Sequence, residues 1–209
     1  MIDVILPESR FAFAQALLEM HHDRKRIFVD RLGWSLPSRQ SWLEIDEFDS
    51  DYAVYLLARD FDTGRHQASV RLLPSTQPHV LGSLFAQLCA DSAPVAEDCW
   101  EISRLVAIPA RSNGTALVRV HRLLALALVE FALTNHIRTY SLVAEADRVP
   151  ALVSVGWDVR PLGLPSLYGD VRLQALQIDI DECTLPAMRR RLGVHQAVLR
   201  SPASQLQAA

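Results

Sequence analysis

Hydrophobic and polar residues follow two spacings along this chain, one typical of strands and one typical of helices. Apolar runs and every-second-residue alternation predict strands at residues 2–6, 52–58, 66–73, 100–108, 138–144, 157–161 and 171–180. Apolar residues three and four apart predict helices from an N-cap at Ser9 to Phe28, and at 81–88, 115–135, 151–155 and 184–192, the last N-capped by Thr184. This order of elements indicates an α/β fold with a mixed, mostly antiparallel sheet.

Two connections stand out between these elements. Residues 60–64 have the composition of a tight hairpin turn between two strands. Residues 33–51 are polar and lack a sustained period, so they predict a long loop. Loops of that length in a compact domain are usually functional or disordered, and Trp34, Trp42 and Phe48 argue against disorder.

The chain has no internal repeat and no linker that would divide it. Its 209 residues suit one large domain, and half of them are hydrophobic, which is enough for a sizeable core. We therefore predict a single domain over residues 1–200, followed by a disordered tail at 201–209.

Charge and targeting signals narrow the class of protein. A net charge of −3 gives no electrostatic reason to expect nucleic acid as a partner, and the arginine run 189–191 is typical of a solvated helix face. The N-terminus lacks a basic region, and the most apolar run, 123–133, is shorter than the ~20 residues that span a bilayer. We expect a cytoplasmic protein without membrane association.

Cysteine and histidine show no metal-binding pattern. The three cysteines form no C-x-x-C pair, and the seven histidines include no i,i+4 pair. The sequence therefore predicts neither a disulfide framework nor a metal site, and a reducing compartment is the simplest setting.

Residues 44–49 hold four carboxylates in six positions, close in sequence to arginines and large aromatic residues. Burying a charge is costly unless the charge is paired or holds a ligand. The cluster therefore indicates a polar, charged small molecule as ligand. The alternative is an ion-pair network that fixes the long loop to the sheet.

A second pattern, R-x-x-G-x-A, lies at Arg111 to Ala116, between a strand and the longest helix. Backbone N–H groups and the helix dipole at such a position can hold phosphate. The pattern resembles the pyrophosphate loop of GCN5-type N-acetyltransferases, in which Arg111 and Gly114 would contact the acyl donor. The alternative is an ordinary turn, because Asn-Gly is common before a helix.

A longer series of motifs resembles the acyl-homoserine lactone synthases, the LuxI-type autoinducer synthases. The series consists of Arg24-x-x-x-Phe28, Gly33-Trp34, Glu44-x-Asp46-x-x-Asp49, Tyr55-Leu56, the segment 71–78, Phe85 and Trp100-Glu101-x-Ser103-Arg104. It covers residues 1 to about 110 well and continues more faintly to about residue 192. Departures occur at Ser75, Gln77 and His79, where the family frequently has Thr, Gly and Tyr.

The resemblance implies a single-domain GCN5-related N-acyltransferase-like fold and a specific reaction. S-adenosylmethionine is the amine donor, and a fatty-acyl thioester of acyl carrier protein or coenzyme A is the acyl donor. The amine attacks the thioester carbonyl; the methionine carboxylate then closes on its own γ-carbon and expels methylthioadenosine. The product is an N-acyl-L-homoserine lactone, a quorum-sensing signal, and no tightly bound cofactor is implied.

The same resemblance implies a role for each matching residue near the amine donor. Asp46 and Asp49 would lie near its cationic groups, and Phe28 and Trp34 would form an aromatic wall, although alone these two rings are more often core. The donor carboxylate needs a cation, which Arg24 or Arg104 can supply, and Arg71 would support the site. Glu44 and Glu47 are predicted to be solvated.

Two further residues are assigned to the chemistry. Glu101, directly or through water, is the predicted general base that removes a proton from the amine. Backbone N–H groups near Ser103 are predicted to stabilise the oxyanion. Leu123, Leu126 and the strand at 140–144 are candidates for an acyl tunnel. In some members of the resembled family a Thr in this strand accompanies a preference for 3-oxo-acyl groups, so the absence of Thr at 141–144 implies that a 3-oxo substrate is less favoured.

Two other functions are also compatible with the sequence. A GCN5-related enzyme could acylate another amine from acyl-coenzyme A, which the R-x-x-G-x-A pattern favours. A non-catalytic ligand-binding regulator is the second alternative, and the complete charged set argues against it. The sequence does not decide the acyl group, the oligomeric state, or whether Arg189–Arg191 meet an acidic carrier protein.

Overall fold

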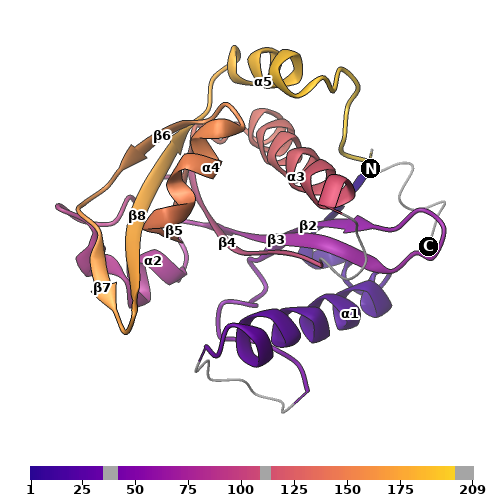
Figure 1. Ribbon diagram of the computed structural model, residues 1–209, viewed down its shortest axis with the longest axis horizontal. Coiled ribbons are helices and arrows are strands. Elements are labelled where there is room, and N and C mark those ends of the chain that lie inside the picture. The colour runs from indigo at the N-terminus through magenta and orange to yellow at the C-terminus, as the bar shows by residue number, and fades with distance from the viewer. Residues whose placement is uncertain (35–41, 109–113, 201–209) are drawn as a thin grey trace. The chain divides into compact units, whose positions relative to one another are not determined.

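The computed structural model describes residues 1–34, 42–108 and 114–200, which form helices and strands in the order shown in Figure 1. The strands are β1 (Ile2–Ile5), β2 (Val54–Arg59), β3 (His66–Pro74), β4 (Cys99–Ala107), β5 (Thr139–Glu145), β6 (Asp158–Pro161), β7 (Ser166–Tyr168) and β8 (Val171–Asp179). The helices are α1 (Ala14–Arg24), α2 (Val80–Leu84), α3 (Gly114–Thr134), α4 (Val149–Ser154) and α5 (Thr184–Leu192).

The chain divides into two compact units. The first comprises Met1–Arg71, Arg104–Leu124 and Val198–Ala209, and the second comprises Leu72–Ser103 and Ala125–Ala197. The elements β3, β4 and α3 each have residues in both units. A single domain over 1–200 stays a prediction, and the predicted tail at 201–209 lies outside the described residues.

In the first unit the strands follow the order β1-β2-β3-β4. β1 runs antiparallel to β2, with Ile2 opposite Ala58 and Ile5 opposite Tyr55. Every residue from Val54 to Ala58 is buried, so this strand is covered on both faces. This double burial explains why residues 54–58 read as an apolar run without alternation.

In the second unit β4 pairs with β5 in parallel, and β5, β6 and β7 all pair antiparallel with β8. The Tyr140 hydroxyl donates to the carbonyl of Leu128 in α3 at 2.9 Å. Val143, by contrast, packs against a core cluster that includes Leu81 of α2. Because side chains alternate along a strand, α3 and α2 cover opposite faces of β5.

Most predicted elements agree with the structure to within about two residues, but several details are wrong. The helix predicted at 81–88 ends at Leu84, and a separate 3-10 turn follows at Ala86–Leu88. Ser9 does not cap α1: Pro7–Ser9 forms a separate 3-10 turn, and the Ser9 hydroxyl accepts the Leu6 N–H at 3.0 Å. The predicted first helix changes at Lys25–Arg31 into a π-helical turn. Strand β7 was not predicted, because its three residues are too few to show an alternation.

The N-cap of α5 is Cys183, one residue before the predicted Thr184. Thr184 instead helps to fix the preceding turn, since its side-chain hydroxyl accepts the N–H of Asp181 at 3.0 Å. Shifts of one residue are usual at helix ends.

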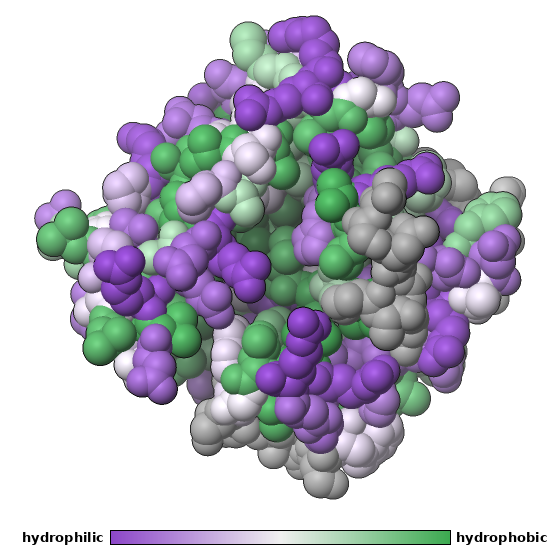
Figure 2. All heavy atoms as spheres, in the orientation of Figure 1, coloured by the Kyte–Doolittle hydropathy of each residue, from purple (hydrophilic) through white to green (hydrophobic). Residues whose placement is uncertain are grey.

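Hydrophilic and hydrophobic residues are interspersed over the face shown in Figure 2. Two of the exposed hydrophobic residues, Phe11 and Phe61, belong to the first unit. Within residues 1–34, 42–108 and 114–200, no helix is both long and apolar enough to cross a membrane.

Candidate active site

Six charged side chains of the first unit form a closed ring of ion pairs in which cations and carboxylates alternate. The cations come from the end of α1, from β3 and from β4, and the carboxylates come from the loop before β2. In order round the ring, the members are Arg24, Glu44, Arg104, Asp46, Arg71 and Asp49. Each arginine therefore bridges two carboxylates, and each carboxylate bridges two arginines.

Asp49 is paired with the two most deeply buried arginines of the ring, Arg24 and Arg71. Arg24 donates to its two carboxylate oxygens at 2.8 and 3.0 Å, a bidentate arrangement. Arg71 lies 3.0 Å away, and the Tyr55 hydroxyl donates to the same carboxylate at 2.8 Å. The Asp46 N–H also donates to Asp49, at 2.9 Å. The Asp49 side chain therefore joins its own loop to α1, β2 and β3.

Asp46 and Glu44 close the other half of the ring. Arg71 donates to Asp46 at 2.5 and 3.2 Å. Arg104 donates to Asp46 at 2.6 Å and to Glu44 at 3.0 Å. Glu44 also accepts from Arg24, so it joins two guanidinium groups that would otherwise repel each other.

The ring is buried but has no net charge, because three arginines meet three carboxylates. Arg104 is its most exposed member, at 11% of its side chain, while the other arginines are almost fully buried. Pairing of this kind is required to offset the several kcal/mol that each buried ion costs. Removing one member leaves its neighbours uncompensated.

The pKa directions follow from this geometry. Burial alone would raise the pKa of Asp49, but the guanidinium groups of Arg24 and Arg71 hold it well below its usual range. For Arg24 the unfavourable effect of burial is outweighed by Asp49, and its pKa is raised. Burial lowers the pKa of Arg104 more than Glu44 raises it, so Arg104 is the least compensated cation of the ring.

An aromatic pair lies beside Arg104. The Phe28 and Trp34 rings stack with their centroids 4.8 Å apart, and the Arg104 guanidinium lies over Phe28 at 5.6 Å. Gly33, with φ of 68°, reverses the chain so that the Trp34 N–H donates to the Phe28 carbonyl at 2.9 Å. We call Phe28, Trp34 and Arg104 the aromatic corner; Trp34 is 37% exposed and is accessible to a ligand.

Arg104 also has an unusual backbone. Its φ is 52°, in the left-handed region that costs a non-glycine residue about 1–2 kcal/mol. Two carboxylates hold its side chain in this conformation. Strain that is retained in this way is common at binding and active sites.

Glu101 and Ser103 lie in the second unit, on β4. Glu101 is almost completely buried, and its carboxylate oxygens accept the N–H groups of Val80 at 3.0 Å and Leu81 at 2.5 Å. It therefore caps the first turn of α2. A carboxylate can accept about four hydrogen bonds, so this capping does not exhaust its acceptor capacity. Ser103 is half-buried.

The structure brings together all seven predicted binding residues in the first unit, namely Arg24, Phe28, Trp34, Asp46, Asp49, Arg71 and Arg104. The prediction that Glu44 is solvated is wrong, because its side chain is buried between Arg24 and Arg104. Glu47 is exposed, as predicted. Arg111 lies outside the described residues, and Gly114 is the first residue of α3.

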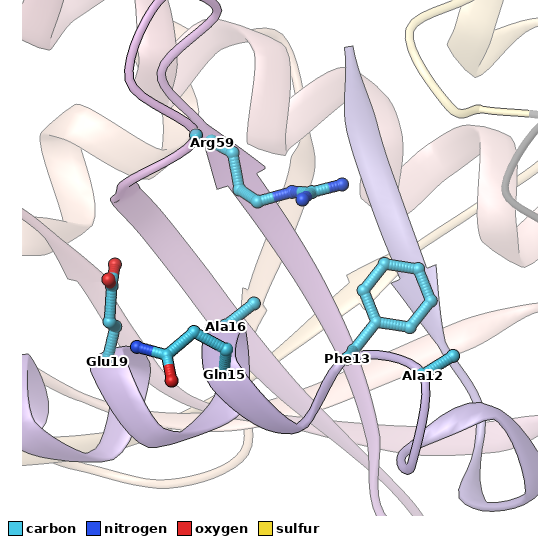
Figure 3. A pocket seen from close by; sticks show the side chains of 7 residues that line it. Ala12, Phe13, Gln15, Ala16, Glu19 and Arg59 are labelled. Atoms are coloured by element: carbon cyan, nitrogen blue, oxygen red, sulfur yellow. The ribbon is translucent and has the colours of Figure 1, made fainter. Parts of the chain in front are cut away.

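A separate pocket of about 200 Å³ opens beside α1 in the first unit (Figure 3). It is lined by Ala12, Phe13, Gln15, Ala16, Glu19, Arg59 and Gly64. Arg59 lies over Phe13 and donates to Asp3 at 2.7 Å, so its charge is already compensated. The pocket contains none of the predicted site residues and is smaller than most ligand pockets.

No group of three or more His, Cys, Asp or Glu side chains in the described ranges is arranged to hold a metal ion. The ion-pair ring combines its carboxylates with arginines, which suits a ligand that carries both signs of charge. With the aromatic corner beside it, the site matches a small zwitterion better than a metal.

The fold is that of the N-acyltransferases. A solved acyl-CoA N-acyltransferase from Pseudomonas aeruginosa superposes with a TM-score of 0.56 at 19% identity, covering 85% of this chain and 97% of that chain. At this identity the likeness concerns the fold alone. It confirms the predicted N-acyltransferase-like fold class.

Closer relatives define the family. The autoinducer synthase family model matches residues 10–188. The isovaleryl-homoserine lactone synthase of Bradyrhizobium diazoefficiens is 30% identical over 95% of this chain and 88% of that protein. A solved CoA-dependent acyl-homoserine lactone synthase, BjaI, bound to SAM and isopentyl-CoA, has a TM-score of 0.87 at 28% identity, covering 100% and 98% of the two chains. The chain therefore belongs to the autoinducer synthase family of acyltransferases, the acyl-homoserine lactone synthases.

Proposed function

We propose that this acyl-homoserine lactone synthase takes its amine from S-adenosylmethionine and its acyl group from a coenzyme A thioester, with a short branched acyl chain as the preferred class. The relative that matches 95% of the chain is named for an isovaleryl product, and the solved BjaI structure contains SAM and isopentyl-CoA. A thioester of acyl carrier protein is the alternative donor.

The aromatic corner is the observation that supports S-adenosylmethionine as the amine donor. S-adenosylmethionine combines a carboxylate with cationic ammonium and sulfonium groups. Arg104, the least compensated cation of the ring, suits the carboxylate, and the accessible Phe28–Trp34 pair suits the sulfonium or the adenine ring. The ring is neutral overall, and within it Asp46 and Asp49 supply the carboxylate oxygens proposed to interact with the ammonium group.

In the proposed reaction Glu101 accepts a proton from the ammonium group, and the free amine attacks the thioester carbonyl. Coenzyme A leaves as its thiol when the amide bond forms. The methionine carboxylate then attacks its own γ-carbon, the carbon–sulfur bond breaks, and methylthioadenosine leaves. Each bond formed is matched by one broken, and the second amine proton leaves with the thiol, so no oxidant is needed.

The direct experiment supplies purified protein with S-adenosylmethionine and either isovaleryl-CoA or isovaleryl-acyl carrier protein. Mass spectrometry should detect the acyl-homoserine lactone and methylthioadenosine in equal amounts, with at least tenfold higher kcat/KM for the coenzyme A thioester. A preference for the carrier-protein thioester would contradict the donor assignment. No lactone from either donor, over a series of straight and branched chains, would contradict the proposed function.

A further inference from the structure

His79 immediately precedes α2, and its side chain makes a single hydrogen bond among the residues that the structure describes. Its ring is 5% exposed, and Nδ1 lies 2.8 Å from the carbonyl oxygen of Gln77. Because a carbonyl oxygen can only accept, Nδ1 carries the proton. Nε2 is buried and has no hydrogen-bond partner within the described ranges. Within residues 1–34, 42–108 and 114–200, the Gln77 carbonyl is therefore the one hydrogen-bond partner of the ring.

Gly82 fixes the other side of the ring. A Cβ at residue 82 would lie 2.7 Å from Cε1 and 2.8 Å from Nε2 of His79, closer than real side chains approach. The imidazole thus fills the space that any larger residue at 82 would need. The ring is held between the Gln77 carbonyl and the Gly82 backbone.

We call the contacts of the His79 ring with Gln77 and Gly82 the clamp. The clamp adjoins the backbone N–H groups that bind Glu101. Val80 and Leu81 directly follow His79, and their N–H groups are the ones that donate to the Glu101 carboxylate. The five-residue helix α2 is far too short to be stable alone. The first turn of α2 must therefore be held in place by the residues that pack against it. The His79 ring is one of these, because it lies against Gly82.

We propose that His79 is a positioning residue for Glu101: its ring fixes the first turn of α2, and the N–H groups of that turn hold the Glu101 carboxylate in its productive orientation. The catalytic part of this inference rests on the proposed role of Glu101.

Three variants test the clamp, and one matched variant serves as control. His79→Ala removes the ring, Gly82→Ala displaces it while favouring the helix, and His79→Asn keeps an N–H donor for the Gln77 carbonyl. We expect the first two to lower kcat by about 10- to 100-fold, the scale of a small misplacement of a catalytic group, with both KM values within about twofold. His79→Asn should retain most of the wild-type kcat. Ser83→Ala, on the exposed side of the same helix, should match wild type.

Double variants then separate positioning from general destabilisation. In a Glu101→Gln background, His79→Ala should cause no further loss of kcat; in a His79→Ala background, Gly82→Ala should cause none either, because the ring is already absent. Losses that multiply in both backgrounds would overturn the proposal, as would a wild-type kcat in His79→Ala.

Hydrogen exchange gives a readout that does not depend on activity. The amides of Val80 and Leu81 should exchange at least tenfold faster in His79→Ala and Gly82→Ala than in wild type or Ser83→Ala. Unchanged exchange would contradict the clamp even if the wild type makes lactone. A wild type that makes no lactone, together with faster exchange in these two variants, would instead place the error in the proposed function.

Discussion

Replacing Asp49 by asparagine is expected to lower the free energy of unfolding by about 3–5 kcal/mol, the usual cost of breaking a buried ion pair from one side. The amide keeps the shape of the side chain but removes its charge, so Arg24 and Arg71 lose a shared counter-ion in a buried site. The Tyr55 hydroxyl and the Asp46 N–H also lose a charged acceptor. Urea denaturation at pH 7 measures the change directly.

Glu47→Gln is the matched control for this variant, because Glu47 lies in the same loop and is exposed. It should change the free energy of unfolding by no more than about 0.5 kcal/mol. An Asp49→Asn protein within about 1 kcal/mol of wild type would show that the ring does not stabilise the fold.

The same carboxylate predicts how stability depends on pH. The pKa of Asp49 is lowered in the folded state, so its contribution is complete above the ordinary value of about 3.9 and is lost as pH falls below it. Wild-type stability should therefore fall steeply between about pH 4 and pH 2, whereas Asp49→Asn should show a flatter curve over that window. Parallel curves would contradict the assigned pKa direction.

The second large effect is expected at Glu101. Glu101→Gln should lower kcat by about 10²- to 10⁴-fold, the usual contribution of a general base, with little change in either KM. The substitution replaces one carboxylate oxygen by an NH₂ group, which cannot accept from Val80 or Leu81. We therefore also expect a stability loss of about 1–3 kcal/mol, the cost of a buried donor left unsatisfied.

The two effects can be separated by measuring turnover well below the unfolding temperature of the variant. If Glu101 only caps α2, the variant should unfold earlier but turn over within about threefold of wild type. That result would remove Glu101 from the chemistry while leaving the family assignment intact. Production of methylthioadenosine is the simplest assay for this comparison.

The ring shows what sequence reasoning could and could not reach. The resemblance to the acyl-homoserine lactone synthases selected Arg24, Asp46, Asp49, Arg71 and Arg104, whereas the residue types alone left a ligand site and an ion-pair network equally open. Glu44 was missed because an irregular loop has no period that says which side chains point inward. Its i,i+2 spacing from Asp46 was the available signal: in extended backbone both side chains face the same way.

The fold could be predicted where burial imposes a regular spacing of apolar residues. It could not be predicted where individual hydrogen bonds determine the local conformation. The alternation over Val171–Asp179 predicted β8 correctly, whereas β7 is a three-residue strand that pairs with β8 and has no alternation of its own. Ser9 has the right chemistry for a helix cap, but its hydroxyl bonds to Leu6 in a shorter turn. The capping of α2 by Glu101, 20 residues away, has no local sequence signal.

A calorimetric titration with S-adenosylmethionine shows whether the amine donor binds at the aromatic corner. Trp34→Ala should raise the Kd about tenfold, since aromatic contact with a cation contributes up to about 2 kcal/mol and 1.4 kcal/mol is a factor of ten. Trp42→Ala, which removes another exposed tryptophan, 51% exposed, from the same loop region, should leave the Kd unchanged. Equal Kd values for wild type and both variants would show that the donor binds elsewhere.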